Sequence, residues 1–269
     1  MATTIVTKYG SDAPATTDIV RGELAVDTEN GRLYTENSSG AIVEIGLKPE
    51  ADVTLATGAD LITASAGTSN VRFGVNAGNS IASGGNYNVV VGDEAGTAIT
   101  TGDGNVFTGY ASGDALTLGS SNTAVGRDSL GSDTKGNHSV AIGRNALTTQ
   151  NFTSATDAYN TAVGSSAGTA VTTGVQNTLI GGLAGDGITT GSANVALGYN
   201  SLSAAGGGNG SIAIGKNALA AQNASGDRIN TAVGLSAGLS VTTGIQNTLI
   251  GGLAGDALTS GAGNTAVGY

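Results

Sequence analysis

A five-residue segment, Asn-Thr-Ala-Val-Gly, returns at a fixed spacing through most of the 269 residues of the chain. It stands at 160–164, 230–234 and 264–268, and variants between these copies keep the same pattern. Twelve copies begin at positions 70, 88, 105, 122, 139, 160, 177, 194, 211, 230, 247 and 264, so most are 17 residues apart. A fixed period of this length is the signature of a repeat architecture. The sequence therefore predicts an all-β fold, a β-solenoid or β-roll of about twelve coils.

Within a coil, the position of a residue predicts its place in the cross-section. We count positions from the first residue of each copy, which is Asn except for Ser at 139 and 211. Position +4 is always Gly and predicts a turn, while positions +1 and +3 share one face of a strand because side chains alternate. We expect +1, +3 and +11 to fill the interior, +7 to hold small residues, and each coil to contain two short strands. The Asn side chains should form a ladder from coil to coil.

Position +2 lies on the opposite face of the strand, yet it is apolar in eleven coils. If +1 and +3 face inward, position +2 forms an exposed apolar stripe, and such stripes usually mark an interface. We therefore expect a homotrimer with +2 facing its axis; cover by a neighbouring loop is the alternative. The trimer-interface candidates are Val90, Phe107, Ala124, Ala141, Ala162, Leu179, Ala196, Ala213, Ala232, Leu249 and Ala266.

A longer period lies over the short one, because residues 160–199 and 230–269 match almost residue for residue. The larger unit contains four coils and begins at about 88, 160 and 230. Insertions at 148–159 and 220–229 enlarge its last coil and should form side loops. The chain stops six residues into a coil, and because solenoids need capped ends we expect the natural protein to be longer.

The first 69 residues lack the repeat. Residues 1–21 predict an extended N-terminal arm, residues 22–47 a small β-meander, and residues 48–69 a connector into the solenoid of 70–269. Asn30 and Gly31 suit a hairpin turn, because a type I′ turn needs positive φ at both central residues. A meander of this size is too small to be stable alone, so it needs a partner.

Composition excludes several classes of function. The chain has 46 Gly, only three Phe and no Trp, a composition that suits a thin core repeated along one axis. The net charge of −10 disfavours nucleic acid and anionic membranes as partners. The chain has no Cys, no signal-peptide pattern and no apolar run of the roughly 20 residues that a membrane span needs. We expect synthesis in a cytoplasm without export by a standard signal.

Two families share these repeat motifs. Asn-Thr-Ala-Val-Gly-Ser-Ser-Ala-Gly at 160–168, with the Thr-Thr-Gly that follows, resembles bacteriophage tail fibre repeats, and Ser-Val-Ala-Ile-Gly at 139–143 resembles the heads of trimeric autotransporter adhesins. The resemblance covers about 200 residues and implies a left-handed, trimeric β-roll. Segments 21–27, 31–34 and 43–45 are similar to the opening of phage tail-fibre chains, which implies docking on the virion there. The docking candidates are Leu24, Val26, Leu33, Tyr34, Ile42 and Ile45.

The phage interpretation is favoured, because an adhesin needs a signal peptide and a membrane anchor; a bacterial surface adhesin head is the alternative. We expect a structural protein of the virion tail, made in the host cytoplasm. Its expected partners are itself, other tail proteins at the N-terminus and a host surface receptor at a distal part, with no nucleic acid and no membrane insertion.

The sequence contains few candidate catalytic or metal-binding residues, and we expect no enzyme activity, no cofactor and no metal. His138 is the single His and is expected at a solvated coil corner. Asp114, Asp186 and Asp256 share position +9 and could ring an ion in a trimer, although solvation explains them more simply. Paired threonines leave ice binding as a lesser alternative; they lie at 100–101, 172–173, 189–190 and 242–243.

Overall fold

The computed structural model describes residues 5–8, 24–27, 32–36, 42–45, 66–204 and 206–269. The chain divides into two compact units, Met1–Leu61 and Ile62–Tyr269. Every regular element of the described residues is a strand, so the predicted all-β class is confirmed. The described part contains no helix long and apolar enough to span a membrane.

The N-terminal unit contains one small sheet of strands β1 (Ile5–Lys8), β2 (Leu24–Asp27), β3 (Arg32–Glu36) and β4 (Ile42–Ile45). β2, β3 and β4 pair antiparallel in sequence order, as the predicted meander requires. β1 pairs parallel with β2, so residues 5–8 of the predicted extended arm form a strand of this sheet, and the rest of that arm lies outside the described residues. The predicted connector lies outside the described residues up to position 65.

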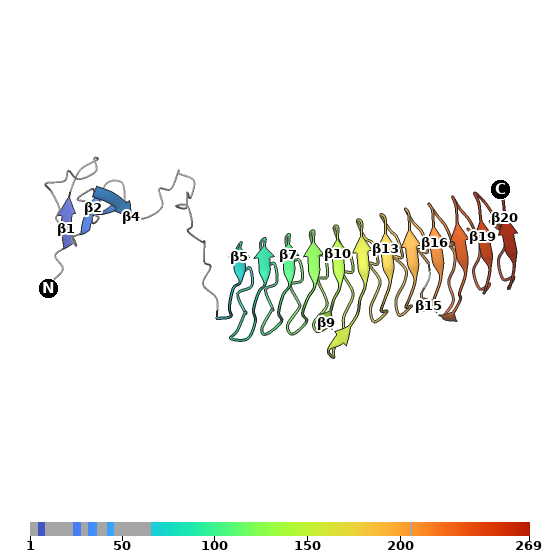
Figure 1. Ribbon diagram of the computed structural model, residues 1–269, viewed down its shortest axis with the longest axis horizontal. Coiled ribbons are helices and arrows are strands. Elements are labelled where there is room, and N and C mark those ends of the chain that lie inside the picture. Colours follow the sequence, from blue (N-terminus) through green and yellow to red (C-terminus); the bar gives the residue numbers. More distant parts are fainter. Residues whose placement is uncertain (1–4, 9–23, 28–31, 37–41, 46–65, 205) are drawn as a thin grey trace. The chain divides into compact units, whose positions relative to one another are not determined.

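The second unit is a parallel β-solenoid (Figure 1). In residues 66–204 and 206–269, twelve strands, one from each coil, join in a single parallel sheet that follows the chain order. The predicted second strand is absent from most of the described coils. The twelve strands are β5 (Val71–Phe73), β6 (Val89–Val91), β7 (Val106–Thr108), β8 (Thr123–Val125), β10 (Val140–Ile142), β12 (Thr161–Val163), β13 (Thr178–Ile180), β14 (Val195–Leu197), β16 (Ile212–Ile214), β18 (Thr231–Val233), β19 (Thr248–Ile250) and β20 (Thr265–Val267).

The two insertions form side loops, as predicted. In the first, β11 (Thr156–Asp157) pairs parallel with β9 (Gly136–Asn137). In the second, β17 (Gly226–Asp227) pairs parallel with β15 (Gly208–Asn209). Figure 1 shows these short strands beside the end of the coil from which the main strands start. We call the segments 148–159 and 220–229 side loop 1 and side loop 2.

The interior of the solenoid holds the residues that the sequence analysis placed outside. Ten of the eleven trimer-interface candidates are fully or almost fully buried within a single chain, and Ala266 in the last coil is half-buried against them. Positions +1 and +3 point to the outer surface instead. The assignment of position +2 to a trimer axis is therefore wrong. The residues that belong to the interior of one chain, and not to a trimer axis, are Val90, Phe107, Ala124, Ala141, Ala162, Leu179, Ala196, Ala213, Ala232, Leu249 and Ala266.

The core is packed by complementary volumes at positions +2 and +8. Phe107 and Leu179 at +2 face Gly113 and Gly185 at +8, where an added Cβ would come within 2.5 and 2.6 Å of the Phe and Leu side chains. The coil of Ala141 has Leu147 at +8. In the coil of Ala162, position +8 is Gly168, and the Leu147 and Leu179 side chains of the neighbouring coils fill the space beside it. Since protein interiors tolerate neither voids nor overlap, position +2 must face inward.

The invariant Gly at +4 closes each strand by close approach of neighbouring coils. At Gly181, φ is +133°, and a Cβ would lie 2.6 Å from the carbonyl oxygen of Gly198 in the next coil. A side chain cannot be accommodated there without moving the backbone of the next coil. The predicted turn at +4 is confirmed. Gly is required there because φ is positive and because the backbone of the next coil lies where a Cβ would be.

Candidate functional site

The outer face of the solenoid sheet is mostly apolar and carries no charged side chain at positions +1 and +3. Its two columns, positions +1 and +3, contain only Val, Ile, Leu, Phe and Thr over all twelve strands. At +3, Phe73, Val125, Ile142, Ile180, Leu197 and Ile250 are 36–47% exposed. An apolar strip this long is unusual on a monomer and is typical of an interaction surface.

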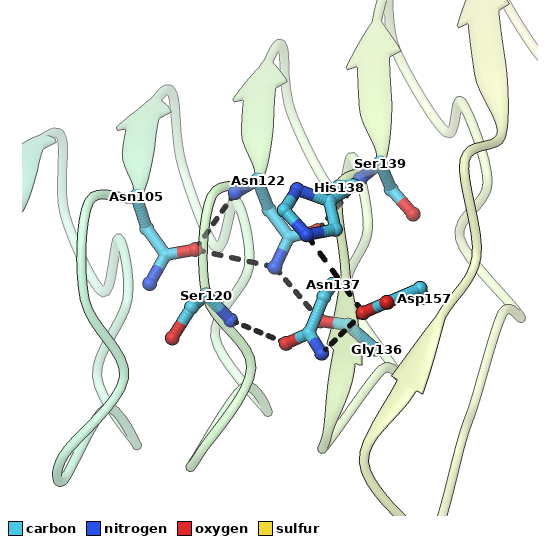
Figure 2. A network of polar contacts seen from close by, with 8 residues as sticks. All are labelled: Asn105, Ser120, Asn122, Gly136, Asn137, His138, Ser139 and Asp157. Atoms are coloured by element: carbon cyan, nitrogen blue, oxygen red, sulfur yellow. Dashed lines mark hydrogen bonds and ion pairs between the residues drawn. The ribbon is translucent and has the colours of Figure 1, made fainter.

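Beneath this face runs a ladder of buried Asn side chains at position 0, as the sequence predicted (Figure 2). Asn122 donates through Nδ2 to Asn105 Oδ1 at 3.2 Å and to the Gly136 carbonyl oxygen at 2.8 Å. Its backbone N–H also reaches Asn105 Oδ1, at 3.0 Å. Asn122 Oδ1 accepts from the backbone N–H of Ser139 at 2.9 Å, so both polar atoms of the side-chain amide are hydrogen-bonded, as a buried amide requires. The ladder fixes each coil on the one before it.

Two Gln residues of the side loops repair the ladder where Ser replaces Asn. Gln150 Nε2 donates to Ser139 Oγ at 2.9 Å, and Gln150 Oε1 accepts from Asn160 Nδ2 at 2.9 Å. Gln222 makes the same contacts with Ser211 and Asn230. Both Gln occupy +11, the position that the sequence assigned to apolar core residues. The sequence analysis missed this pairing, although Ser at 0 and Gln at +11 occur together in both enlarged coils.

The first of these sites also contains a buried carboxylate. Asp133 is fully buried and accepts from Gln150 Nε2 at 2.6 Å and from the backbone N–H of Gly136 and Phe152. Three donors satisfy the charge, so Asp133 anchors the base of side loop 1.

A second line of polar contacts leads to the exposed side loops. Ser120 N–H donates to Asn137 Oδ1, and Asn137 Nδ2 donates to Asp157 Oδ1 at 3.1 Å (Figure 2). His138 Nε2 lies 3.7 Å from the same carboxylate, and its ring stacks on Tyr159 at 5.1 Å. His138 is exposed at the coil corner, where the sequence placed it.

The Asp residues at +9 do not come together within the chain, since four coils separate each from the next. Burial raises the pKa of Asp114 and of Asp186, and Asp186 Oδ1 is buried without a hydrogen-bond partner. Within the described residues no three His, Asp or Glu side chains are grouped as a metal ion would require.

In three of the Thr pairs, the hydroxyl of the first Thr forms a hydrogen bond within the solenoid. Thr100 Oγ1, Thr172 Oγ1 and Thr242 Oγ1 each donate to the backbone carbonyl of the Thr in the next coil, at 3.0–3.3 Å. In these three pairs the second Thr, at 101, 173 and 243, is an exposed residue. The single column that remains offers ice a narrower surface than paired Thr columns would.

The docking candidates all lie in β2, β3 and β4, where Val26 is opposite Leu33 and Leu33 is opposite Ile45. Tyr34 is buried, so its side chain is withdrawn from the surface of this unit. The side chains of Leu24, Val26, Leu33, Ile42 and Ile45 lie outside the described residues.

Comparison of the chain with models of known protein families, with curated proteins and with solved structures finds no match.

Proposed function

We propose that this chain is a structural component of a bacteriophage tail fibre, in which the solenoid is a stiff rod. The observation that carries the proposal is the apolar outer face, which runs over all twelve strands of a parallel sheet. Backbone ladders and the Asn ladder both run along the axis, so bending the rod would stretch many hydrogen bonds at once. The resemblance of the repeats and of the N-terminal segment to phage tail fibres supplies the biological setting.

The rod is a homotrimer in which the side chains at positions +1 and +3 face the threefold axis. Burial of these two columns, which are mostly Val, Ile and Thr, supplies the hydrophobic driving force, since about 25 cal/mol is gained for each Å² of apolar surface removed from water. Parallel solenoids place equal coils at equal height around a threefold axis. This assembly replaces the arrangement in which +2 faced the axis.

The N-terminal unit docks on other tail proteins, and a distal part contacts the host surface receptor. The protein resides in the virion tail after synthesis in the host cytoplasm. Its role is mechanical and adhesive rather than enzymatic.

Immunogold labelling of purified phage particles with antibodies against the solenoid tests this function. Gold is expected along the fibres. A variant lacking residues 1–47 is expected to keep a folded rod, because the two units are separate, and to be missing from particles. Gold on the surface of uninfected bacteria, with none on particles, would instead favour the adhesin alternative.

A further inference from the structure

Two cations of the solenoid have no polar partner in the described part of their own chain. Arg144 and Lys216 occupy position +5, just after the Gly corner, and both are exposed. Within the described residues neither side chain makes a hydrogen bond or an ion pair. Arg127, in the same column, pairs with its own neighbour Asp128 at 2.9 Å. Arg144 and Lys216 are therefore the available cations of this column.

The two coils that carry these cations also carry the side loops. Each side loop presents an exposed carboxylate three residues before the Asn that begins the next coil, Asp157 in one and Asp227 in the other. Asn137 Nδ2 holds Asp157 at 3.1 Å and Asn209 Nδ2 holds Asp227 at 3.2 Å. An Asn side chain at the equivalent position thus orients each carboxylate. The cation and the carboxylate recur together once per four-coil unit.

Cation and carboxylate lie at opposite edges of the outer face. The cation follows the strand, whereas the side-loop strands lie at the end from which the strand starts (Figure 1). The main strand and the turns on either side of it separate the two groups, and no ion pair joins them within the described residues. Arg228, near Asp227, directs its guanidinium to the carbonyl oxygens of Ser225 and Thr243.

We propose that these charges pair between copies of the chain and set their axial register. The proposal rests on the trimer proposed above. Around a threefold axis parallel to the rod, the +5 edge of each chain faces the side-loop edge of the next at nearly equal height. Arg144 then meets Asp157 of the adjacent copy, and Lys216 meets its Asp227. Charge-assisted contacts of this kind select partners and register more than they add affinity.

The apolar face alone cannot supply that register. Its columns repeat with every coil, so a slip of one coil, about 4.8 Å, leaves Val, Ile and Thr in matching places. The charged pairs recur only every fourth coil, so the same slip separates them. The coil that begins at Asn88 departs from this pairing of opposite charges, because it carries Asp93 at +5 and Asp103 at the opposite edge. Asp103 Oδ1 is engaged by the Asn86 N–H at 2.6 Å.

A charge-swapped chain tests the proposal. It carries Arg144→Glu, Lys216→Glu, Asp157→Lys and Asp227→Lys, and is co-refolded with isotope-labelled wild type before native mass spectrometry. Each chain is expected to form trimers with itself, and mixed trimers are expected to be depleted below random proportions, because every mixed interface opposes like charges. Trimers that mix at random would overturn the charge pairing and leave the trimer standing. A monomeric wild type would overturn both.

If the swapped chain fails to fold, Arg144→Glu with Lys216→Glu replaces it, since these two exposed side chains make no hydrogen bond or ion pair in the described part of their own chain. Loss of an exposed pair costs roughly a factor of two, and six pairs per trimer, with the added repulsion between Glu and Asp, predict association at least on the order of fiftyfold weaker at low salt. The difference should vanish near 1 M salt, where screening is strong. Arg127→Gln is the matched control and should leave association unchanged. Equal association constants for wild type and double variant overturn the proposal.

Discussion

Gln222 completes the hydrogen bonding of Ser211, its neighbour across the coil interior. Its amide donates to Ser211 Oγ at 3.0 Å and accepts from Asn230 Nδ2 at 2.8 Å. Ser211 is too short to reach Asn230 in the next coil, so the ladder would be broken without Gln222. Two residues eleven positions apart therefore share the task that one Asn performs in the other coils.

A double-mutant cycle at this pair checks the relationship. Gln222→Val should cost about 2–4 kcal/mol of unfolding free energy, because Ser211 and Asn230 lose buried partners. Adding Ser211→Asn recreates the Asn and Val combination of the coil that contains Asn230 and Val241, and should recover most of the loss. Denaturant unfolding measures all four chains. Additive losses, with no recovery in the double variant, would contradict the shared role.

Two adjacent glycines give a matched steric test. Gly181→Ala is expected to cost about 2–4 kcal/mol, because its Cβ would meet the Gly198 carbonyl and its φ is +133°. At Gly182 the nearest atom to an added Cβ is 3.6 Å away, in the Tyr199 ring. Gly182→Ala should therefore change the free energy of unfolding by less than about 1 kcal/mol. Similar losses for both variants would argue against close approach at +4.

The Asn ladder can be opened at one coil. Asn177→Ala removes the contacts to Asn160 and Asn194, and we expect a loss of about 3 kcal/mol. Hydrogen exchange of the Asn194 amide should accelerate, since its acceptor Asn177 Oδ1 is lost. Gln176→Ala, on the exposed neighbour, is the control and should leave exchange unchanged. Unaltered protection at Asn194 would show that the ladder contributes little.

The period and the Asn ladder could be predicted because both depend on single, repeated residue types. Gly at +4 and Asn at 0 each have one physical explanation, and the structure confirms both. The register of the faces could not be predicted in the same way. A strand of three residues with apolar side chains at +1, +2 and +3 satisfies an alternating pattern in either phase.

The information that resolves the phase lies in volumes at distant positions. Phe107 with Gly113, and Ala141 with Leu147, show that +2 and +8 compete for the same space. The roles of Gln150 and Gln222 were hidden for a related reason. A polar residue at an apolar core position makes sense only with the Ser that it contacts across the coil.

The pKa of Asp186 gives a pH-dependent prediction. Burial raises that pKa, so the folded state binds the proton more tightly than the unfolded state does. The group therefore favours folding below the ordinary range of an Asp and loses this contribution as pH rises through the folded pKa. Asp186→Asn should stabilise the chain at pH 7 by less than about 1 kcal/mol after solvent screening. Thermal unfolding at pH 7 and pH 3 measures this, and an equal gain at both would contradict it.

Single charges on the outer face should dissociate the trimer. Ile180→Asp places a carboxylate in the centre of the apolar face, and its desolvation on association should abolish trimers at micromolar concentration. Leu118→Asp changes an even more exposed apolar residue, at position +13 and away from the sheet, and should leave them intact. Sedimentation velocity distinguishes the two. Dissociation by Leu118→Asp alone would place the interface elsewhere.

The most direct test is the mass of the wild-type chain in solution, by sedimentation equilibrium or native mass spectrometry. The chain has a mass of 25.8 kDa, and we predict three times that value at micromolar concentration. A single species with the mass of one chain would contradict association through the outer face, and with it the trimeric rod.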